Sequence, residues 1–168
     1  SGIVYRKNNK HYVLTASHVI ADEADKDGCK TYGTKPILVC TMRNDGNDIC
    51  FASPAKVVFN DSQTDFAILE FEKEPTNEVQ VSQFHFGDIH IGQRVYAVGN
   101  SSLDINSVST GINQHTNRSS LSDTTKRKFI QTNCSGGPGL SGGGLYLENG
   151  LCIGMVILKN ESSQSMYA

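Results

Sequence analysis

The chain divides into many short apolar runs, each ended by turn-forming residues, and this pattern most constrains its fold. The expected strands are residues 3–6, 12–15, 36–42, 55–59, 66–71, 94–98, 107–112, 128–132, 143–147 and 152–158. Residues 7–10, with two asparagines, have the composition of a hairpin turn. No long segment has a helical period, and only residues 17–21 are expected to form a short helical turn. Short strands at this spacing predict an all-β barrel or sandwich.

A polar connection divides the strands into two groups. Residues 72–92 contain Pro75, Gly87 and Gly92 and carry no strand pattern. A chain of 168 residues is an ordinary length for one domain or for two small subdomains that share a site. We therefore expect an N-terminal half over residues 1–78 and a C-terminal half over residues 79–168, which together form one domain.

Charge and hydropathy exclude several classes of partner. The net charge is −2, so no electrostatic argument favours nucleic acid or an anionic membrane surface. No apolar run approaches the roughly 18 residues of a membrane-spanning helix. The histidines show no metal-ligand spacing with each other or with cysteine, and no CxxC pair occurs. We expect no metal, no nucleic acid partner and no membrane span in this chain.

The five cysteines are an odd and unevenly spaced set: Cys29, Cys40, Cys50, Cys134 and Cys152. Such a set argues against a full disulfide framework. It favours free thiols in an intracellular or organellar reducing compartment. One bridge across a hairpin, for example between Cys40 and Cys50, stays open as an alternative.

Two residues in the first half are candidates for an acid–base pair. His18 follows an apolar strand, and a histidine has the near-neutral pKa that a general base needs. Asp65 opens the apolar run 66–71, where a half-buried carboxylate needs a partner such as a histidine N–H. Taken singly, His18 reads as a surface or core histidine and Asp65 as a turn residue.

The second half contains a candidate nucleophile in a glycine-rich turn. Ser141 lies between Gly139-Leu140 and Gly142-Gly143-Gly144. A nucleophilic serine needs a sharp turn with backbone N–H groups near the developing oxyanion, and flanking glycines permit that conformation. A flexible linker is the alternative, but apolar strands follow at once. The chain order of the three candidates is histidine, aspartate and serine, which is one of the known orders of a catalytic triad.

Several short segments resemble one family in their order along the chain. They are the opening SGIV, residues 13–20 (VLTASHVI), 64–69 (TDFAIL), 86–100, 109–112 (STGI), 130–143 and 150–155. In these segments the chain resembles the trypsin-like peptidases, and within them the HtrA/Deg proteases most closely. The resemblance implies two six-stranded antiparallel β-barrels, residues 1–78 with His18 and Asp65 and residues 79–168 with Ser141. The active site would lie in the cleft between them.

The resemblance implies a serine endopeptidase that acts on polypeptides through an acyl-enzyme. Ser141 would be the nucleophile, His18 the general base and acid, and Asp65 the residue that orients His18. The backbone N–H groups of Gly139 and Ser141 would form the oxyanion hole. No metal or organic cofactor is implied. The family's trimer contacts come largely from an N-terminal segment that this sequence does not contain, so the resemblance predicts no oligomeric state.

The resemblance also places the residues that bind substrate. Ser135, Ile157, Leu158 and Lys159 would line the pocket for the P1 side chain. No aspartate lies at the expected base of this pocket, which disfavours cleavage after Lys or Arg. No histidine lies on the 157–159 strand, which disfavours a preference for Gln. Ile157 and Leu158 favour a small apolar P1 residue.

Leu140 departs from the family pattern, because trypsins carry Asp and HtrA proteins usually Asn before the nucleophile. With Gly144 in place of the usual Pro or Ala, it leads us to expect an oxyanion loop only partly ordered at rest. Leu140 supports one alternative, an activator-dependent or catalytically inactive pseudoprotease that acts as a binding module. Two further alternatives are a viral-type protease and an all-β carbohydrate- or peptide-binding domain with a chance triad. The resemblance starts and stops inside the family's domain, so we expect an excised protease domain.

Overall fold

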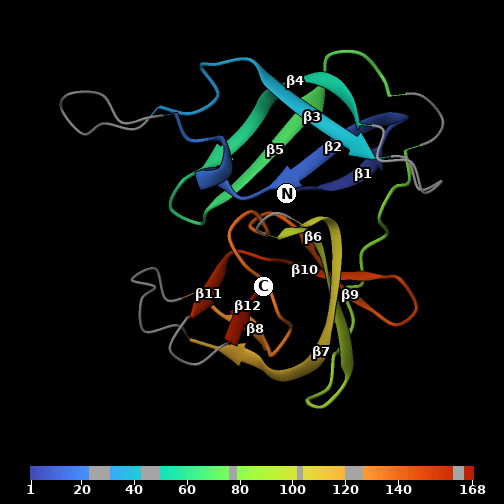
Figure 1. Cartoon of the computed structure of the whole chain (residues 1–168), viewed down its shortest axis with the longest axis vertical. Helices are drawn as coiled ribbons and strands as arrows, with labels where there is room; N and C mark the ends of the chain where they lie inside the picture. The colour runs from blue at the N-terminus through green and yellow to red at the C-terminus, as the bar shows by residue number, and fades with distance from the viewer. Residues whose placement is uncertain (23–30, 43–49, 76–78, 102–103, 120–126, 161–164) are drawn as a thin grey trace. The chain divides into compact units, whose positions relative to one another are not determined.

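Antiparallel β-strands make up almost all of the regular structure in the computed structural model (Figure 1). The structure describes residues 1–22, 31–42, 50–75, 79–101, 104–119, 127–160 and 165–168. The chain forms two compact units, one of residues Val4–Val81 and one of Ser1–Ile3 with Ser82–Ala168. The predicted boundary after residue 78 lies three residues before this division. Within the described residues no helix is long and apolar enough to cross a membrane.

The Val4–Val81 unit is built on a five-stranded sheet in the order β1-β2-β5-β4-β3. The strands are β1 (Ile3–Lys7), β2 (Lys10–Thr15), β3 (Ile37–Met42), β4 (Cys50–Asp61) and β5 (Phe66–Phe71), with a 3-10 turn, η1 (Ser17–Ile20), after β2. Burial alternates strictly along β5, as expected for a strand with one face on a core. The buried cluster comprises Val13, Ile20, Ala55, Ala67, Leu69 and Phe71.

The hairpin predicted between the first two strands is confirmed. Strands β1 and β2 are neighbours joined by Asn8 and Asn9, whose φ angles are 50° and 61°. Two central residues with positive φ are the mark of a type I′ turn, and asparagine tolerates this conformation better than most residues.

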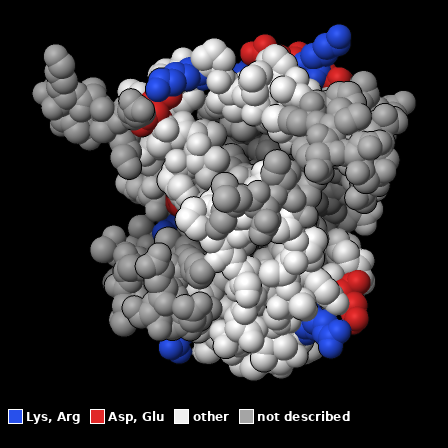
Figure 2. All heavy atoms as spheres, in the orientation of Figure 1, with Lys and Arg blue, Asp and Glu red and all other residues white. Residues whose placement is uncertain are grey.

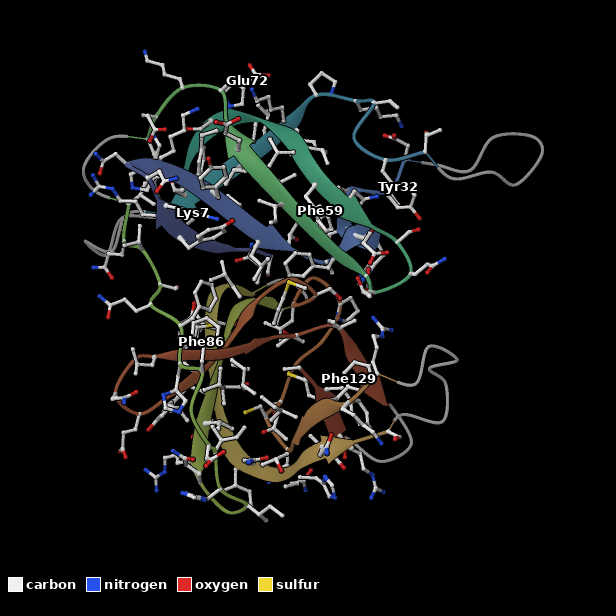
Figure 3. All side chains as sticks on the ribbon, turned by 180° about the vertical axis from the view of Figure 1, so that it is seen from behind. Lys7, Tyr32, Phe59, Glu72, Phe86 and Phe129 are labelled. Carbon is white, nitrogen blue, oxygen red and sulfur yellow. The ribbon has the colours of Figure 1, made fainter. Side chains whose placement is uncertain are left out.

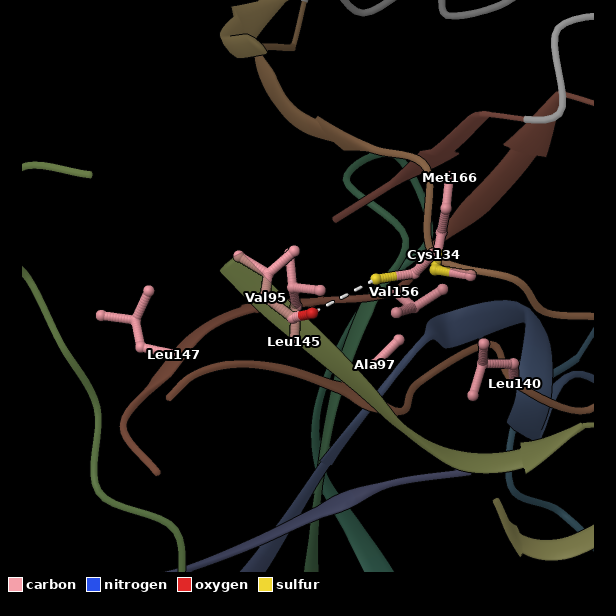
Figure 4. Close-up of a cluster of buried hydrophobic side chains, with 8 residues drawn as sticks. All are labelled: Val95, Ala97, Cys134, Leu140, Leu145, Leu147, Val156 and Met166. Carbon is pink, nitrogen blue, oxygen red and sulfur yellow. Dashed lines mark hydrogen bonds between the residues drawn. The ribbon is translucent and has the colours of Figure 1, made fainter. Parts of the chain in front are cut away.

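The other unit holds a seven-stranded sheet in the order β10-β9-β6-β7-β8-β12-β11. The strands are β6 (Arg94–Ser101), β7 (Asp104–Arg118), β8 (Phe129–Thr132), β9 (Gly144–Leu147), β10 (Cys152–Met155), β11 (Leu158–Asn160) and β12 (Ser165–Tyr167). Register shifts at Asn113/His115 and His115/Arg118 interrupt the pairing of β7 with β8. The core cluster, drawn in Figure 4, comprises Val95, Ala97, Cys134, Leu140, Leu145, Leu147, Val156 and Met166.

Aromatic side chains pack between strands β8 and β12 of the same unit. Phe129, labelled in Figure 3, is 3% exposed and meets the Tyr167 ring edge-on at a centroid distance of 5.9 Å. The Arg127 guanidinium lies 5.2 Å from the centre of the Phe129 ring, within the range of a cation–π contact. Strands β8 and β12, which pair directly, are thus also joined through their side chains.

The observed architecture is the all-β double barrel that the sequence predicted, with one difference in detail. The two sheets contain five and seven described strands instead of six each. Strand β4 is longer than expected because Pro54 does not end it. Pro54 lies beyond Ala55–Phe71, the last pair between β4 and β5, so its missing N–H costs little in the ladder.

The expectation of free cysteines is wrong for Cys40 on β3, which is disulfide-bonded. Cys134 and Cys152 are free and buried, as expected. Burial raises the pKa of the Cys152 thiol, so that thiol stays protonated and unreactive at neutral pH. A bridge at Cys40 removes the main support for a reducing compartment.

Charged side chains of opposite sign lie close together on the surface. Glu70 accepts from Lys10 at 2.7 Å and from Lys56 at 3.1 Å. On the face in Figure 2, blue and red side chains are likewise interspersed, without a large patch of one sign among the described atoms.

We predict that Leu145→Ala destabilises the seven-stranded unit by about 2–5 kcal/mol, because it leaves a cavity in a close-packed core. Leu145 is fully buried in the cluster of Figure 4. Urea unfolding measures the change in the free energy of unfolding. Tyrosine fluorescence is the signal, because the chain has no tryptophan. The control is Val108→Ala, which removes an aliphatic side chain that is 63% exposed. Equal losses for the two variants would contradict the assigned core.

Candidate active site

His18 is displayed by a 3-10 turn that leaves the end of β2. Ala16 is extended, with φ −75° and ψ 141°, and the Val19 N–H donates to the Ala16 carbonyl at 3.0 Å. Ile20 packs into the core of the Val4–Val81 unit and holds the far end of the turn. The turn thereby buries Ser17 and Ile20 and leaves the His18 side chain 47% exposed.

Asp65 holds His18 through two hydrogen bonds. The backbone N–H of His18 donates to Asp65 Oδ1 at 2.9 Å, and His18 Nδ1 lies 2.7 Å from Asp65 Oδ2. A carboxylate only accepts hydrogen bonds, so this partner keeps the proton of a neutral imidazole on Nδ1. The other ring nitrogen, Nε2, is then unprotonated and able to accept a proton. The Asp65 side chain is 16% exposed and the contact is partly shielded from water.

The turn before β5 fixes the position of Asp65. The Asp61 carboxylate accepts from the Gln63 N–H at 2.9 Å, from the Thr64 N–H at 3.3 Å and from the Thr64 hydroxyl at 2.6 Å. This Asx turn delivers Asp65 with a φ of 56°, in the left-handed region. Aspartate is one of the few non-glycine residues that enter this region readily. The two bonds to His18 are made from this unusual backbone conformation.

A second contact fastens the histidine turn to the same hairpin. The Ser17 side chain is buried, and its hydroxyl donates to Asn60 Oδ1 at 2.7 Å. Asn60 lies on β4, opposite Ala67 of β5. The turn is therefore held on both sides, by Asn60 through Ser17 and by Asp65 through His18. Neither Ser17 nor Asn60 was predicted from the sequence, because their pairing follows from the register of β4.

Ser141 lies in a tight turn just before β9, in the seven-stranded unit. Gly139 and Gly142 on either side have φ angles of 97° and 84°, which glycine adopts without strain. The Gly143 N–H donates to the Leu140 carbonyl at 2.8 Å and closes the turn. Two further bonds of 2.8 Å, Gly142 N–H to the Val156 carbonyl and Val156 N–H to the Gly143 carbonyl, tie it to the chain that follows β10.

The backbone N–H groups of Gly139 and Ser141 have no hydrogen-bond acceptor among the described residues. Gly139 is exposed and Ser141 is half-buried. Backbone donors that lack a protein partner are available to a ligand or to water. The predicted pair of oxyanion donors is therefore chemically available on one short turn.

Leu140 occupies a space that three glycines leave for it. A Cβ atom on Gly99 would lie 2.9 Å from Leu140 Cδ1, one on Gly136 2.5 Å from Cδ2, and one on Gly143 3.3 Å from Cδ1. Leu140 is 3% exposed and belongs to the core of Figure 4. The departure that raised doubt in the sequence is thus an apolar anchor, because the pocket is apolar and an unpaired carboxylate there would be costly.

The predicted substrate residues all lie in the same unit as Ser141. Ser135 is exposed and precedes the glycine turn. The Ile157 N–H donates to the Tyr167 carbonyl at 3.0 Å, and its side chain is half-buried. Leu158 and Lys159 open β11, where they pair with Tyr167 and Met166. No cluster of three His, Cys, Asp or Glu side chains suited to a metal occurs among the described residues.

The sequence of the chain is similar to that of known peptidases. The family model of the trypsin-like peptidase domain matches residues 1–155. A probable periplasmic serine protease, do/HhoA-like, of Haemophilus influenzae is 33% identical over 156 residues, which cover 92% of this chain and 29% of that protein. The periplasmic pH-dependent serine endoprotease DegQ of Escherichia coli is 31% identical over 155 residues, covering 92% and 30%.

A relative from a Gram-positive bacterium shows the same relationship. The serine protease Do-like HtrB of Bacillus subtilis is 28% identical over 173 residues, covering 97% of this chain and 33% of that protein. The chain spans about a third of the length of these relatives. The periplasmic names of two of them run against the reducing compartment that the cysteine count favoured.

We predict that Ser17 and Asn60 are energetically coupled. Ser17→Ala should lower the free energy of unfolding by about 1–3 kcal/mol, because the partly buried Asn60 carbonyl loses its donor. Asn60→Ala should cost a similar amount, and the double variant should cost less than the sum of the two. Urea unfolding of the four proteins gives the coupling energy.

The matched control for this cycle is Ser53→Ala, also on β4, whose hydroxyl has no hydrogen bond among the described residues. It should change stability by no more than about 0.5 kcal/mol. Strict additivity of the Ser17 and Asn60 substitutions would show that the two side chains do not interact.

Proposed function

The chain belongs to the trypsin-like peptidase family, and from this membership we propose that it is a serine endopeptidase whose catalytic residues are His18, Asp65 and Ser141. The observation that carries the proposal is the contact of 2.7 Å between His18 Nδ1 and Asp65 Oδ2. A surface histidine without a catalytic role does not need a carboxylate that binds both its ring and its backbone N–H. The substrate class is polypeptide, in keeping with relatives that are named as proteases.

The first half of the reaction transfers an acyl group to Ser141. Its Oγ attacks the carbonyl carbon of the scissile peptide, and its proton passes to His18 Nε2. The electron pair of the carbonyl moves to oxygen and forms a tetrahedral oxyanion. When this intermediate collapses, the C–N bond breaks and His18 gives the proton to the departing amine. The product is an ester between Ser141 and the acyl part of the substrate.

The second half returns the enzyme to its starting state. A water molecule gives a proton to His18 Nε2 and attacks the ester carbonyl. The ester C–O bond breaks, and Ser141 takes the proton back from His18. Asp65 stays ionised throughout and stabilises the imidazolium that forms in each half. The reaction needs no oxidant, reductant or cofactor.

Stabilisation of the oxyanion falls to the N–H groups of Gly139 and Ser141. Support comes from the absence of an intramolecular acceptor for either group among the described residues. Donors of this kind contribute most when they are fixed before the reaction, because they need no reorganisation as charge develops. The packing of Leu140 between three glycines supports a turn that is ordered without an activator.

We assign the P1 pocket to Ser135, Ile157, Leu158 and Lys159, with preference for a small apolar side chain. In a peptide library, cleavage should follow Ala or Val more often than Arg, because the sequence has no aspartate at the expected base of the pocket to pair with a basic side chain. Mass spectrometry of the cleaved bonds gives the preference. Cleavage mainly after Arg or Lys would contradict this assignment.

The central test is labelling of Ser141 with a fluorophosphonate probe, with casein cleavage measured in parallel. We expect the wild-type chain to be labelled and to cleave casein, and Ser141→Ala to do neither. The control Ser53→Ala should behave as wild type, because that residue lies in the other unit and on β4. Labelling without cleavage would indicate a narrow substrate range or an activator. A wild-type chain that is never labelled would support the pseudoprotease alternative.

A second test concerns the tautomer of His18. Asp65→Asn presents an N–H or a weaker acceptor to Nδ1 and so favours the wrong tautomer. We expect kcat to fall by about 10⁴-fold, as for other triads of this type, with little change in KM. Hydrolysis of a thioester or ester substrate is sensitive enough to follow the residual rate. A loss below tenfold would remove Asp65 from the mechanism.

A further inference from the structure

The segment before the proposed nucleophile needs support that its own sequence does not provide. Residues 135–139 read Ser-Gly-Gly-Pro-Gly, and three glycines in five positions give a chain with many accessible conformations. Ordering such a segment costs conformational entropy, so other groups must hold it if the Gly139 N–H is to stay in place. At its end, the Leu140 N–H donates to the Gly137 carbonyl at 3.3 Å, which is long for a hydrogen bond.

Three serine side chains contact alternate residues of this segment. The Ser109 hydroxyl donates to the Ser135 carbonyl. The Gly137 N–H donates to Ser101 Oγ at 2.7 Å.

The third contact is at Gly139, whose carbonyl accepts from the Ser1 hydroxyl at 2.7 Å. The spacing of two residues is that of a strand, which offers its hydrogen-bonding groups to one side at every second residue. The three hydroxyls therefore do for this irregular segment what a neighbouring strand does in a sheet.

Strands β6 and β7 of the seven-stranded sheet hold the three serines in place. Ser101 ends β6 and Ser109 lies on β7, where it pairs with Ala97 of β6. Ser1 is joined to the same strand, because the Asn100 N–H donates to Ser1 Oγ at 2.8 Å. Strand β6 is interior to the seven-stranded sheet, between β9 and β7. The contacts thus transmit the order of the sheet to the glycine segment.

We propose that Ser1, Ser101 and Ser109 are positioning residues that hold residues 135–139 so that the Gly139 N–H is available to the oxyanion. The inference rests on the proposed function for its catalytic consequence, but not for the contacts themselves. Leu140 anchors the end of the segment through apolar packing. The serines hold the backbone along the segment in place through hydrogen bonds. Their proposed role is exerted through the backbone of residues 135–139.

The test compares Ser101→Ala and Ser109→Ala with a matched control, Ser107→Ala. The Ser107 hydroxyl also lies on β7 and also donates to a backbone carbonyl, that of Gly99 at 3.0 Å. Its substitution removes a hydroxyl-to-carbonyl hydrogen bond from the strand that carries Ser109, and the carbonyl concerned lies outside residues 135–139. Thermal unfolding of each variant shows whether the fold is kept.

Two measurements are made on the full chain. The first is the rate of Ser141 labelling by the fluorophosphonate probe. We expect it to fall about tenfold for Ser101→Ala and for Ser109→Ala, which is the order of magnitude of one hydrogen bond. We expect no change for Ser107→Ala, and recovery in Ser101→Thr and Ser109→Thr, which keep the hydroxyl.

The second measurement is amide hydrogen exchange at Gly137 and Leu140 by NMR, which does not depend on activity. Ser101→Ala should speed exchange at Gly137 by about tenfold or more, because its N–H loses its acceptor. If wild-type Ser141 is never labelled but exchange responds in this way, the serines hold the segment and the proposed function fails. If both serine variants match Ser107→Ala in labelling and in exchange, the positioning role is overturned.

Discussion

The pairing of the Asp65 carboxylate with His18 is the interaction on which the rest of the candidate site depends. It joins a 3-10 turn after β2 to the start of β5, two segments 47 residues apart in the chain. It requires Asp65 to adopt a left-handed backbone conformation, which the Asx turn of Asp61 prepares. These contacts fix the orientation of the imidazole ring and direct its Nδ1 toward the carboxylate.

In the unit that carries Ser141, the turn around the serine must be held by neighbouring residues. This turn consists largely of glycine, which permits the shape but does not hold it. Leu140 supplies apolar anchorage in a pocket that other glycines leave open, and serines of the sheet satisfy the backbone of the preceding segment. Residues that are distant in the chain thereby give the glycine-rich segment before Ser141 a defined conformation.

Much of this protein was predictable from short patterns in the sequence. The strand runs predicted an all-β fold, and the ordered motifs predicted the trypsin-like peptidase family, which the match over residues 1–155 confirms. The disulfide at Cys40 was predicted only as an alternative to free thiols, because an odd number of cysteines carries no information on which of them approach each other. The continuation of β4 past Pro54 was missed because the extent of β5 decides whether a proline is tolerated there.

The sequence alone determined the residue types of the candidate site, because a histidine, a carboxylate and a serine in a glycine turn stand in the chain order of a known triad. It also determined the periodicity of the strands, which is a local property of the chain. Only the tertiary structure decided how those residues are held. The Ser17–Asn60 bond, the pocket of Leu140 and the serine contacts to residues 135–139 depend on strand register and on close approach between distant segments. A linear sequence does not encode such distances in any local pattern, because they arise when the sheets form and pack.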